Sequence, residues 1–258
     1  MLPDQTYAVV LKVTDHGESD KIVTFCSPIR GKLTGIAKGA KRSKKRFVNK
    51  LEIFSHLNIT YVENGRSTLL RIDQAELILS FPSLRKNYKR YTAASLICEQ
   101  MLYWIKENDG DKELFELLIW ALESLENGKS VVGTVILFHI RMFTILGFQP
   151  RISGCIHCGR ADHEGAPYRF NMGRSDLICK KCGSDAGVQG TLISINTVKL
   201  LEKAQELPLH KLGRLKFSTG PAKEAIALLK GYGRHLLQRE THSWKAFESI
   251  WGQSKIKY

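Results

Sequence analysis

The chain has 258 residues, a formal net charge of +14 and a hydrophobic fraction of 43%. This hydrophobic fraction is ample for packed cores, so the composition excludes an intrinsically disordered chain. The most apolar stretch, residues 131–146, contains His139 and Arg141 and is too short to span a bilayer. The first residues lack a basic region followed by an apolar run, so we expect no secretory leader and a cytoplasmic protein with reduced thiols.

Five short segments rich in Val, Ile, Thr and Phe occupy the first eighty residues of the chain. They are residues 6–13, 21–27, 32–37, 52–62 and 68–77, and turn residues separate them. Strands at this spacing predict a small antiparallel barrel or sandwich. A five-stranded barrel of the oligonucleotide/oligosaccharide-binding (OB) type has this size, and that fold binds single-stranded nucleic acids.

A strongly basic stretch lies within this region. Residues 29–50 carry nine Lys or Arg side chains and no Asp or Glu. Because apolar residues such as Ile36, Phe47 and Val48 recur through it, we expect a loop and strand end pinned to a fold, with the cations on its surface. Such a cluster attracts a polyanion by releasing condensed counterions. The alternative is a solvated surface that aids solubility, although scattered charge of both signs serves that purpose better.

The pattern becomes helical after residue 82. Apolar residues recur at helical intervals in five stretches, namely 88–105, 114–125, 131–146, 196–207 and 221–239. The third stretch is apolar nearly all round, which predicts a helix at the centre of a bundle. The basic residues from Lys199 to Arg239 form either a solvated helix face or an extension of the anion-binding surface.

Four cysteines interrupt the helical region. Cys155, Cys158, Cys179 and Cys182 form two Cys-x-x-Cys pairs, each followed by Gly, with twenty residues between the pairs. Tetrahedral zinc takes four soft donors at about 2.3 Å, and two such turns supply them. We therefore predict a structural Cys₄ zinc site that holds residues 151–190 folded and leaves no open coordination position.

Other uses of the cysteines remain open at this point. A redox dithiol, disulfides or an unused remnant are the alternatives to zinc, and His157 and His163 are substitute ligands. The two remaining cysteines, Cys26 and Cys98, lie in strand and helix patterns and are expected to be small buried residues. The predicted domains are then a barrel at residues 1–82, a helical domain at 83–150 and 191–258, and the zinc insert between its two parts.

No enzyme is predicted. Asp15, His16 and Ser19 have the side chains of a nucleophilic triad but are crowded into one turn, with no sign of an oxyanion hole. The glycines of the basic stretch lack the pattern of a phosphate-binding loop. No two carboxylates stand out as a pair with opposed roles.

The motifs of the first domain resemble those of a known family. Residues 17–47, GESDKIVTFCSPIRGKLTGIAKGAKRSKKRF, followed by LEIFSHLNI at 51–59 and AEL at 75–77, are similar to the RecO family of bacterial DNA repair proteins. The resemblance continues through the helices and ILGF at 145–148, so it covers nearly the whole chain. It implies an α+β fold, with an N-terminal five-stranded OB-type barrel followed by an α-helical domain carrying a Cys₄ zinc-knuckle insert.

The resemblance also implies a function. RecO-like proteins are non-enzymatic mediators of recombinational repair in the RecF pathway, in the cytoplasm and associated with the nucleoid. They bind single- and double-stranded DNA, anneal complementary strands, and cooperate with RecR and the C-terminal tail of the single-stranded DNA-binding protein to load RecA. By the same resemblance, DNA contacts are expected at Lys38, Lys41, Arg42, Lys44, Lys45 and Arg46, with Arg30 and Lys32 as lesser candidates.

Two points stay open from the sequence. A receptor for an acidic tail needs an apolar groove with cations at its rim. Side chains such as Leu114, Phe115, Leu118, Phe138 and Met142, with Arg141 nearby, offer one but equally suit a helical core. The competing functions are an RNA-binding or ribosome-associated zinc protein, and a zinc-dependent hydrolase, which would require an open metal position.

Overall fold

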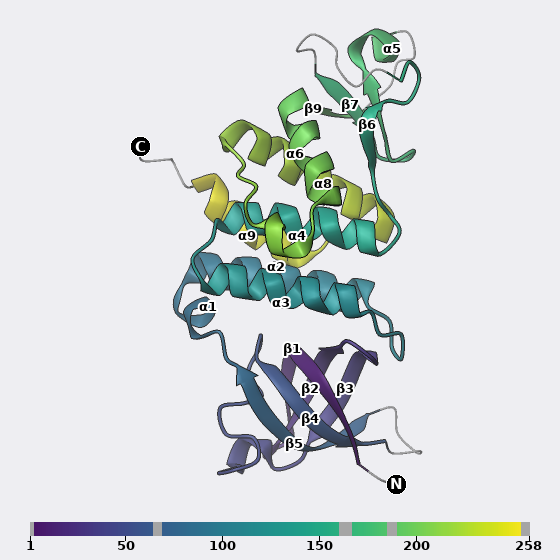
Figure 1. The fold of residues 1–258 in the computed structure, drawn as a ribbon. Coiled ribbons are helices and arrows are strands. Elements are labelled where there is room, and N and C mark those ends of the chain that lie inside the picture. The colour runs from purple at the N-terminus through teal and green to yellow at the C-terminus, as the bar shows by residue number, and fades with distance from the viewer. Residues whose placement is uncertain (1–2, 64–68, 160–166, 185–189, 254–258) are drawn as a thin grey trace. The chain divides into compact units, whose positions relative to one another are not determined.

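The computed structural model describes residues 3–63, 69–159, 167–184 and 190–253. The chain divides into two compact units, Met1–Glu126 and Asn127–Tyr258. The first unit holds a β-barrel and three helices, and the second holds a small sheet and the remaining helices (Figure 1). Each unit is described by itself.

The barrel is closed, with the strand order β1-β2-β3-β5-β4. Its strands are β1 (Asp4–His16), β2 (Asp20–Ser27), β3 (Gly31–Ala37), β4 (His56–Val62) and β5 (Leu70–Leu79). Neighbours are antiparallel except β3 and β5, which pair in parallel at two positions. β1 pairs with β4 through its first half and with β2 through its second, with a bulge between Val10 and Lys12. The five-stranded OB-type barrel is thus confirmed, and the alternative of a sandwich is excluded.

Alternating side chains fill the barrel. In β3 and β4 every second residue is buried, as expected for strands with one face on a core. The fully buried side chains include Phe25, Leu57 and Ile59. The same core takes in Phe47 and Leu51, which come from the connection between β3 and β4. The basic stretch is therefore anchored in the barrel, as predicted.

Three helices complete the first unit. They are α1 (Pro82–Lys86), α2 (Tyr88–Trp104) and α3 (Lys112–Glu126). The hairpin between β2 and β3 fits against the connection from α2 to α3, where Lys32 N donates to Lys106 O at 2.8 Å. Both the hairpin and the connection need a glycine here. A Cβ on Gly31 of the hairpin would lie 2.4 Å from Lys106 O, and a Cβ on Gly110 of the connection would lie 2.1 Å from Ile29 C. This close approach fixes one end of the barrel to the helices.

The second unit begins with α4 (Val131–Ile145), whose N-cap Ser130 accepts a hydrogen bond from Gly133 N at 3.1 Å. A four-stranded sheet follows in the order β6-β8-β7-β9. Its strands are β6 (Arg151–Cys155), β7 (Tyr168–Asn171), β8 (Asp176–Cys179) and β9 (Thr191–Ile193). The helices of this part are α5 (Lys180–Ser184), α6 (Ile195–Glu206), α7 (Leu209–Leu212), α8 (Thr219–Leu237) and α9 (His242–Gln253).

Aromatic contacts join the sheet to the helices of this unit. Tyr232 of α8 lies between Phe143 of α4 and Phe170 of β7, at ring-centroid distances of 5.2 and 5.6 Å. α4 packs against α6 and α8, which agrees with its predicted central place in a bundle. Across the described residues, no helix combines the length and the hydropathy that a membrane crossing demands.

Candidate nucleic-acid interface and metal centre

The barrel basic segment, residues 38–50, follows β3 as a turn of 3-10 helix (Ala40–Arg42) and a series of turns. Phe47, only 3% exposed, enters the barrel core, while Lys44, Lys45 and Arg46 just before it are exposed. The apolar side chain fixes the backbone and leaves the cations in solvent. A cluster held in this way has little conformational freedom to lose when it binds a polyanion.

The Gly-Glu-x-Asp motif at residues 17–20 fastens the start of this segment. Asp20 Oδ1 accepts hydrogen bonds from Gly39 N and Ser19 Oγ, both at 2.8 Å. The hydrogen bond from Gly39 is the main reason why the pKa of Asp20 lies below its ordinary value. Gly39 has φ of 69°, a left-handed conformation that suits glycine. Asp20 therefore has a structural role in the first turn.

Arg46 and Lys50 tie the segment to itself and to the barrel. Arg46 donates to Lys38 O at 3.2 Å and to Asp73 O at 3.5 Å, and its guanidinium lies 5.0 Å from the Phe47 ring centroid. Lys50 Nζ donates to two carbonyls of the segment, each at 3.1 Å. Because all these acceptors are neutral, both side chains keep an uncompensated positive charge.

The remaining cations of the segment differ in their partners. Lys41 pairs with Asp15 at 3.1 Å and Arg42 with Glu18 at 3.5 Å, so acids of the neighbouring turn partly neutralise them. Lys38, Lys44 and Lys45 are exposed and form no ion pair within the part of the chain that the structure describes. Among the described residues, the cations of the segment without an acidic partner are therefore these three lysines, Arg46 and Lys50.

Arg30 and Lys32 lie at the opposite end of β3. Lys38 lies six positions after Lys32, a span of about 20 Å in a strand. Arg30 forms an ion pair with Glu63, and Lys32 Nζ donates to Leu102 O at the C-terminal end of α2, at 3.4 Å. Six of the eight predicted contact residues thus share one segment, and the two lesser candidates do not lie with them.

One exposed cation on the outer barrel surface was not predicted. Lys12 of β1 is opposite Thr24 of β2, which is opposite Thr34 of β3. Thr34 shares the outer face of β3 with Lys32 and Ile36. Lys32, Thr34 and Ile36 form a row along the outer face of β3, and Thr24 and Lys12 extend it sideways across β2 and β1. The bulge between Val10 and Lys12 places the Lys12 side chain on this face, because strict alternation from the buried Thr6, Ala8 and Val10 would have turned it inward.

The four predicted ligand cysteines come together in the second unit. Their Sγ atoms all lie within 4.8 Å of one another. Tetrahedral coordination with metal–sulfur bonds of about 2.3 Å requires sulfurs about 3.8 Å apart. The distance between Cys158 Sγ and Cys179 Sγ is 3.9 Å. The donor set and its spacing therefore fit a metal ion.

The ends of two parallel neighbours, β6 and β8, build this cluster. Cys155 ends β6, Cys179 ends β8, and each Cys-x-x-Cys turn carries the second cysteine back toward the first. Gly159 has φ of 68°, which lets its N–H reach Cys155 O at 2.8 Å. Gly183 does not have a left-handed backbone; it lies in α5 against Ile178.

Backbone N–H groups point at the sulfurs. Cys179 N donates to Cys155 Sγ at 3.4 Å, and Cys182 N donates to Cys179 Sγ at 3.5 Å. Burial alone would raise the pKa of Cys155, but donors from Cys179, Cys158 and His157 lower it to about 6. A thiolate is the form that binds a metal. The cluster is complete without His157, and His163 lies outside the described residues.

The two other cysteines are buried. Cys26 is 2% exposed and Cys98 is 1% exposed, as their strand and helix patterns predicted. Burial raises the pKa of Cys26 to about 12, so its thiol stays protonated at neutral pH. Neither belongs to the four-cysteine cluster.

The side chains considered for a tail-binding groove are core residues. Leu114, Phe115 and Leu118 are at most 7% exposed in the first unit, and Phe138 and Met142 are fully buried in the second. Arg141 donates a hydrogen bond to Gln205 O. These residues stabilise their own units, so they do not define a surface groove.

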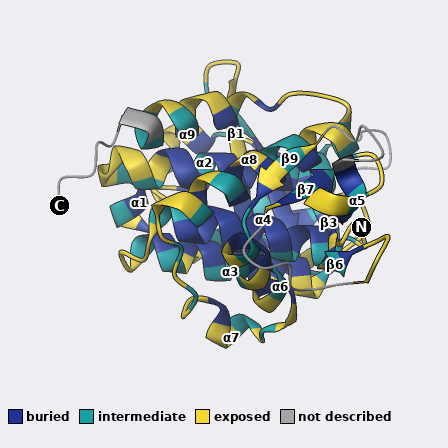
Figure 2. Cartoon of the chain, turned by 90° about the horizontal axis from the view of Figure 1, so that it is seen from above, coloured by how far each residue is buried: buried dark blue, intermediate teal, exposed yellow. Residues whose placement is uncertain are grey.

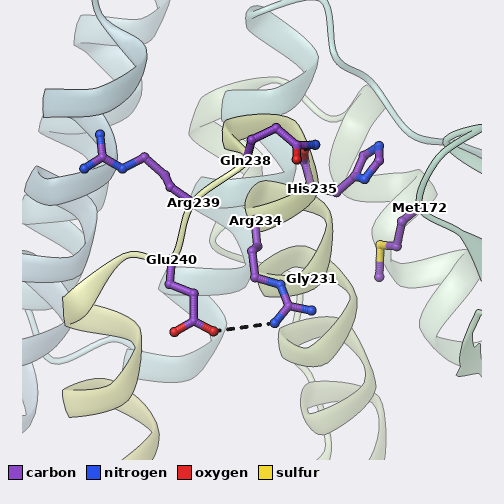
Figure 3. Close-up of a pocket in the computed structure, with 7 residues that line it drawn as sticks. All are labelled: Met172, Gly231, Arg234, His235, Gln238, Arg239 and Glu240. Carbon is purple, nitrogen blue, oxygen red and sulfur yellow. Dashed lines mark hydrogen bonds and ion pairs between the residues drawn. The ribbon is translucent and has the colours of Figure 1, made fainter.

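A pocket of about 580 Å³ lies at the C-terminal end of α8. Its lining residues are Met172, Gly231, Arg234, His235, Gln238, Arg239 and Glu240 (Figure 3). Glu240 pairs with Arg234 at 3.5 Å and with Lys245 at 3.7 Å, while the Arg239 side chain extends away from the other labelled groups. Glu240 partly neutralises Arg234 and Lys245. Among the described residues, Lys38, Lys44 and Lys45 of the barrel basic segment have no such acidic partner.

Comparisons with known proteins agree with this architecture. Residues 1–81 match the family model "Recombination protein O N terminal", and residues 85–245 match "Recombination protein O C terminal". The chain is 33% identical to "DNA repair protein RecO" of Syntrophus aciditrophicus over 247 residues, covering 95% of each protein. It is 32% identical to "DNA repair protein RecO" of Syntrophobacter fumaroxidans over 248 residues, covering 96% of this chain and 98% of the relative.

An OB-type barrel followed by helices with a four-cysteine cluster defines a class of protein that combines a nucleic-acid-binding fold with a helical part carrying a candidate metal centre. Both family models match within this chain, and together they cover most of it. The chain belongs to the RecO family. Its role is accordingly in DNA repair and recombination.

Proposed function

We propose that the protein is a non-enzymatic recombination mediator, which binds and anneals DNA strands and helps to load RecA on single strands coated with the single-stranded DNA-binding protein. Membership of the RecO family supports this proposal. The observation that carries it is the barrel basic segment, whose uncompensated cations are fixed by Phe47, Asp20 and Arg46.

The mechanism follows from electrostatics. Two phosphate backbones repel each other, and a cationic surface lowers this repulsion by displacing their condensed counterions. Lys38, Lys44, Lys45 and Arg46 would contact the backbone, with Lys41 and Arg42 contributing less because of their acidic partners. Contacts to the backbone leave the base edges available for pairing. Arg30 and Lys32 remain lesser candidates, at the far end of the outer face of β3.

The metal of the four-cysteine cluster is proposed to be zinc. Cys155, Cys158, Cys179 and Cys182 would hold it, and four thiolates would fill its tetrahedral shell. When bound, zinc would act as a structural cross-link between the ends of β6 and β8. With no position left for a catalytic water, this shell does not support a hydrolase.

The partners are also proposals. RecR, the RecA pathway and the C-terminal tail of the single-stranded DNA-binding protein follow from the family resemblance. Strand annealing on DNA coated with that protein, with and without its last residues, would test the tail. Loss of stimulation without the tail supports the proposal, whereas equal annealing contradicts it. A higher affinity for RNA than for DNA would instead favour the RNA-binding alternative.

The DNA-binding surface is tested by changing Lys38, Lys44 and Lys45 to Gln. A matched control changes three cations of the first unit that have acidic partners and are not predicted contacts, Lys21, Arg71 and Lys112. We expect the first variant to bind every single strand at least about tenfold more weakly, and its slope of log affinity against log salt to fall by about 2. The control should change far less. Equal effects in the two variants would contradict the proposed surface.

A further inference from the structure

A second stretch with charge of one sign lies in the second unit. Residues 207–223, here called the helical basic segment, connect α6 to the first turn of α8 and include α7. They contain no Asp or Glu and four Lys or Arg side chains, Lys211, Arg214, Lys216 and Lys223. All four residues are exposed, and Figure 2 shows the largely exposed surface around α7. This is the counterpart, in the helical unit, of the barrel basic segment.

The four cations are not compensated. Within the described parts of the chain, none of them forms an ion pair with an acid. Other cations of the same unit do, because Lys230 pairs with Glu248 at 2.7 Å and Arg234 pairs with Glu240. An unpaired set of this kind keeps its full positive potential for a ligand from solution.

The backbone of the segment is held in place. Leu212 is fully buried and Ala222 is 5% exposed, so apolar side chains anchor both ends of the run. Around Leu212, Lys211 N donates to Pro208 O at 2.9 Å and Arg214 N donates to Lys211 O at 3.0 Å. The cations therefore stand at defined positions on an ordered turn, as they do in the barrel.

The arrangement indicates the chemical class of the ligand. The four cations are spread along the segment, so they suit an extended polyanion better than a small anion, which needs donors that converge on one point. The large hydrophobic side chains of residues 207–223 are buried or half-buried, whereas the four cations are exposed, so charge dominates the surface that a ligand would meet. A phosphodiester backbone is an extended polyanion that binds through its charges, so it fits this surface.

We propose that the helical basic segment binds a second nucleic-acid strand while the barrel basic segment holds the first. This inference rests on the proposed annealing function, because annealing brings together two backbones that repel each other. A protein with one cationic site for each strand lowers the repulsion between them. The two sites lie in different units, so each can be changed without altering the fold of the other.

The experiment uses the full chain with Lys211, Arg214, Lys216 and Lys223 changed to Gln. The control removes three cations of the same unit that have acidic partners, Lys230, Arg234 and Lys245. Two non-complementary single strands, one with a donor dye and one with an acceptor, report by energy transfer whether one protein holds both. Annealing rates of complementary strands are measured in parallel, and thermal unfolding checks that both variants fold.

We expect the affinity for the first strand to change less than about threefold in the variant, while energy transfer disappears and annealing slows at least about tenfold. Restoring the charges in a Lys211→Arg, Arg214→Lys, Lys216→Arg, Lys223→Arg chain should restore both. Wild-type energy transfer and annealing in the Gln variant would overturn the inference, as would an equal loss in the control. Absence of energy transfer in the wild type would also overturn it. The proposed DNA binding by the barrel is tested separately, by the variant in which Lys38, Lys44 and Lys45 are changed to Gln.

Discussion

The backbone of the barrel basic segment and the sheet of β6 to β9, which carries the four-cysteine cluster, are fixed in two different ways. The barrel segment lies on a preformed core and inserts Phe47 and Leu51 into it. The sheet of β6 to β9 brings four sulfurs within 4.8 Å of one another around a point where a metal fits. The difference shows that a charged surface can be fixed by burial of a few apolar side chains, whereas the sheet inserted in the helical domain brings together side chains suited to coordination bonds.

The reason lies in the apolar area available to each region. The barrel encloses side chains from five strands, so the ring of Phe47 packs among apolar side chains when it is inserted. The strands of the sheet in the second unit are only three to five residues long, so each offers few positions for core side chains, although Phe170 does reach Tyr232 of α8. Metal binding compensates for such a deficit, because the ion binds the folded chain far better than the unfolded one.

Removal of the metal should have the largest effect. Changing Cys158 to Ser, or adding a chelator, should cost on the order of 10 kcal/mol of local stabilisation and expose the amides of β6 to β8. Amides of the barrel should keep their protection. Hydrogen exchange and metal analysis measure both, with Cys98→Ala as a control that removes a buried thiol outside the cluster. Unchanged protection of the sheet would show that the metal is not its anchor.

Truncation of the barrel anchor should come next. Phe47→Ala should lower the free energy of unfolding by about 3 to 5 kcal/mol, because it leaves a cavity in the barrel core. The neighbouring Val48 is 44% exposed, so Val48→Ala should change stability by less than about 0.5 kcal/mol. Denaturant unfolding measures both values. Similar losses for the two variants would mean that Phe47 does not anchor the segment.

The smallest effect is expected at Asp20. Its pKa is lowered chiefly by the hydrogen bond from Gly39, so this contact is complete above the ordinary value of 3.8 and is lost as the pH falls through the lowered pKa of the folded protein. The amide chemical shift of Gly39 should follow this titration. In Asp20→Ala the shift should no longer titrate, and DNA affinity should fall severalfold as the segment loosens. An unchanged titration would assign the shift to another group.

Much of this protein could be predicted from local patterns. Strand alternation, helical periodicity and the spacing of the cysteines each depend on neighbours within a few residues, so they identified the barrel, the main helices and the four ligands. The concentration of Lys and Arg between residues 29 and 50 likewise indicated a polyanion-binding surface before any fold was known.

The tertiary structure decided which of those cations lie together and which have acidic partners. Lys41 and Arg42 face Asp15 and Glu18 across a turn, and Arg30 and Lys32 lie at the far end of β3, contacts that charge counting does not show. It also brought Lys12 onto the outer face of the same strands. Ion pairs and burial depend on residues far apart in sequence, and their energies follow distances that exist only once the chain has folded.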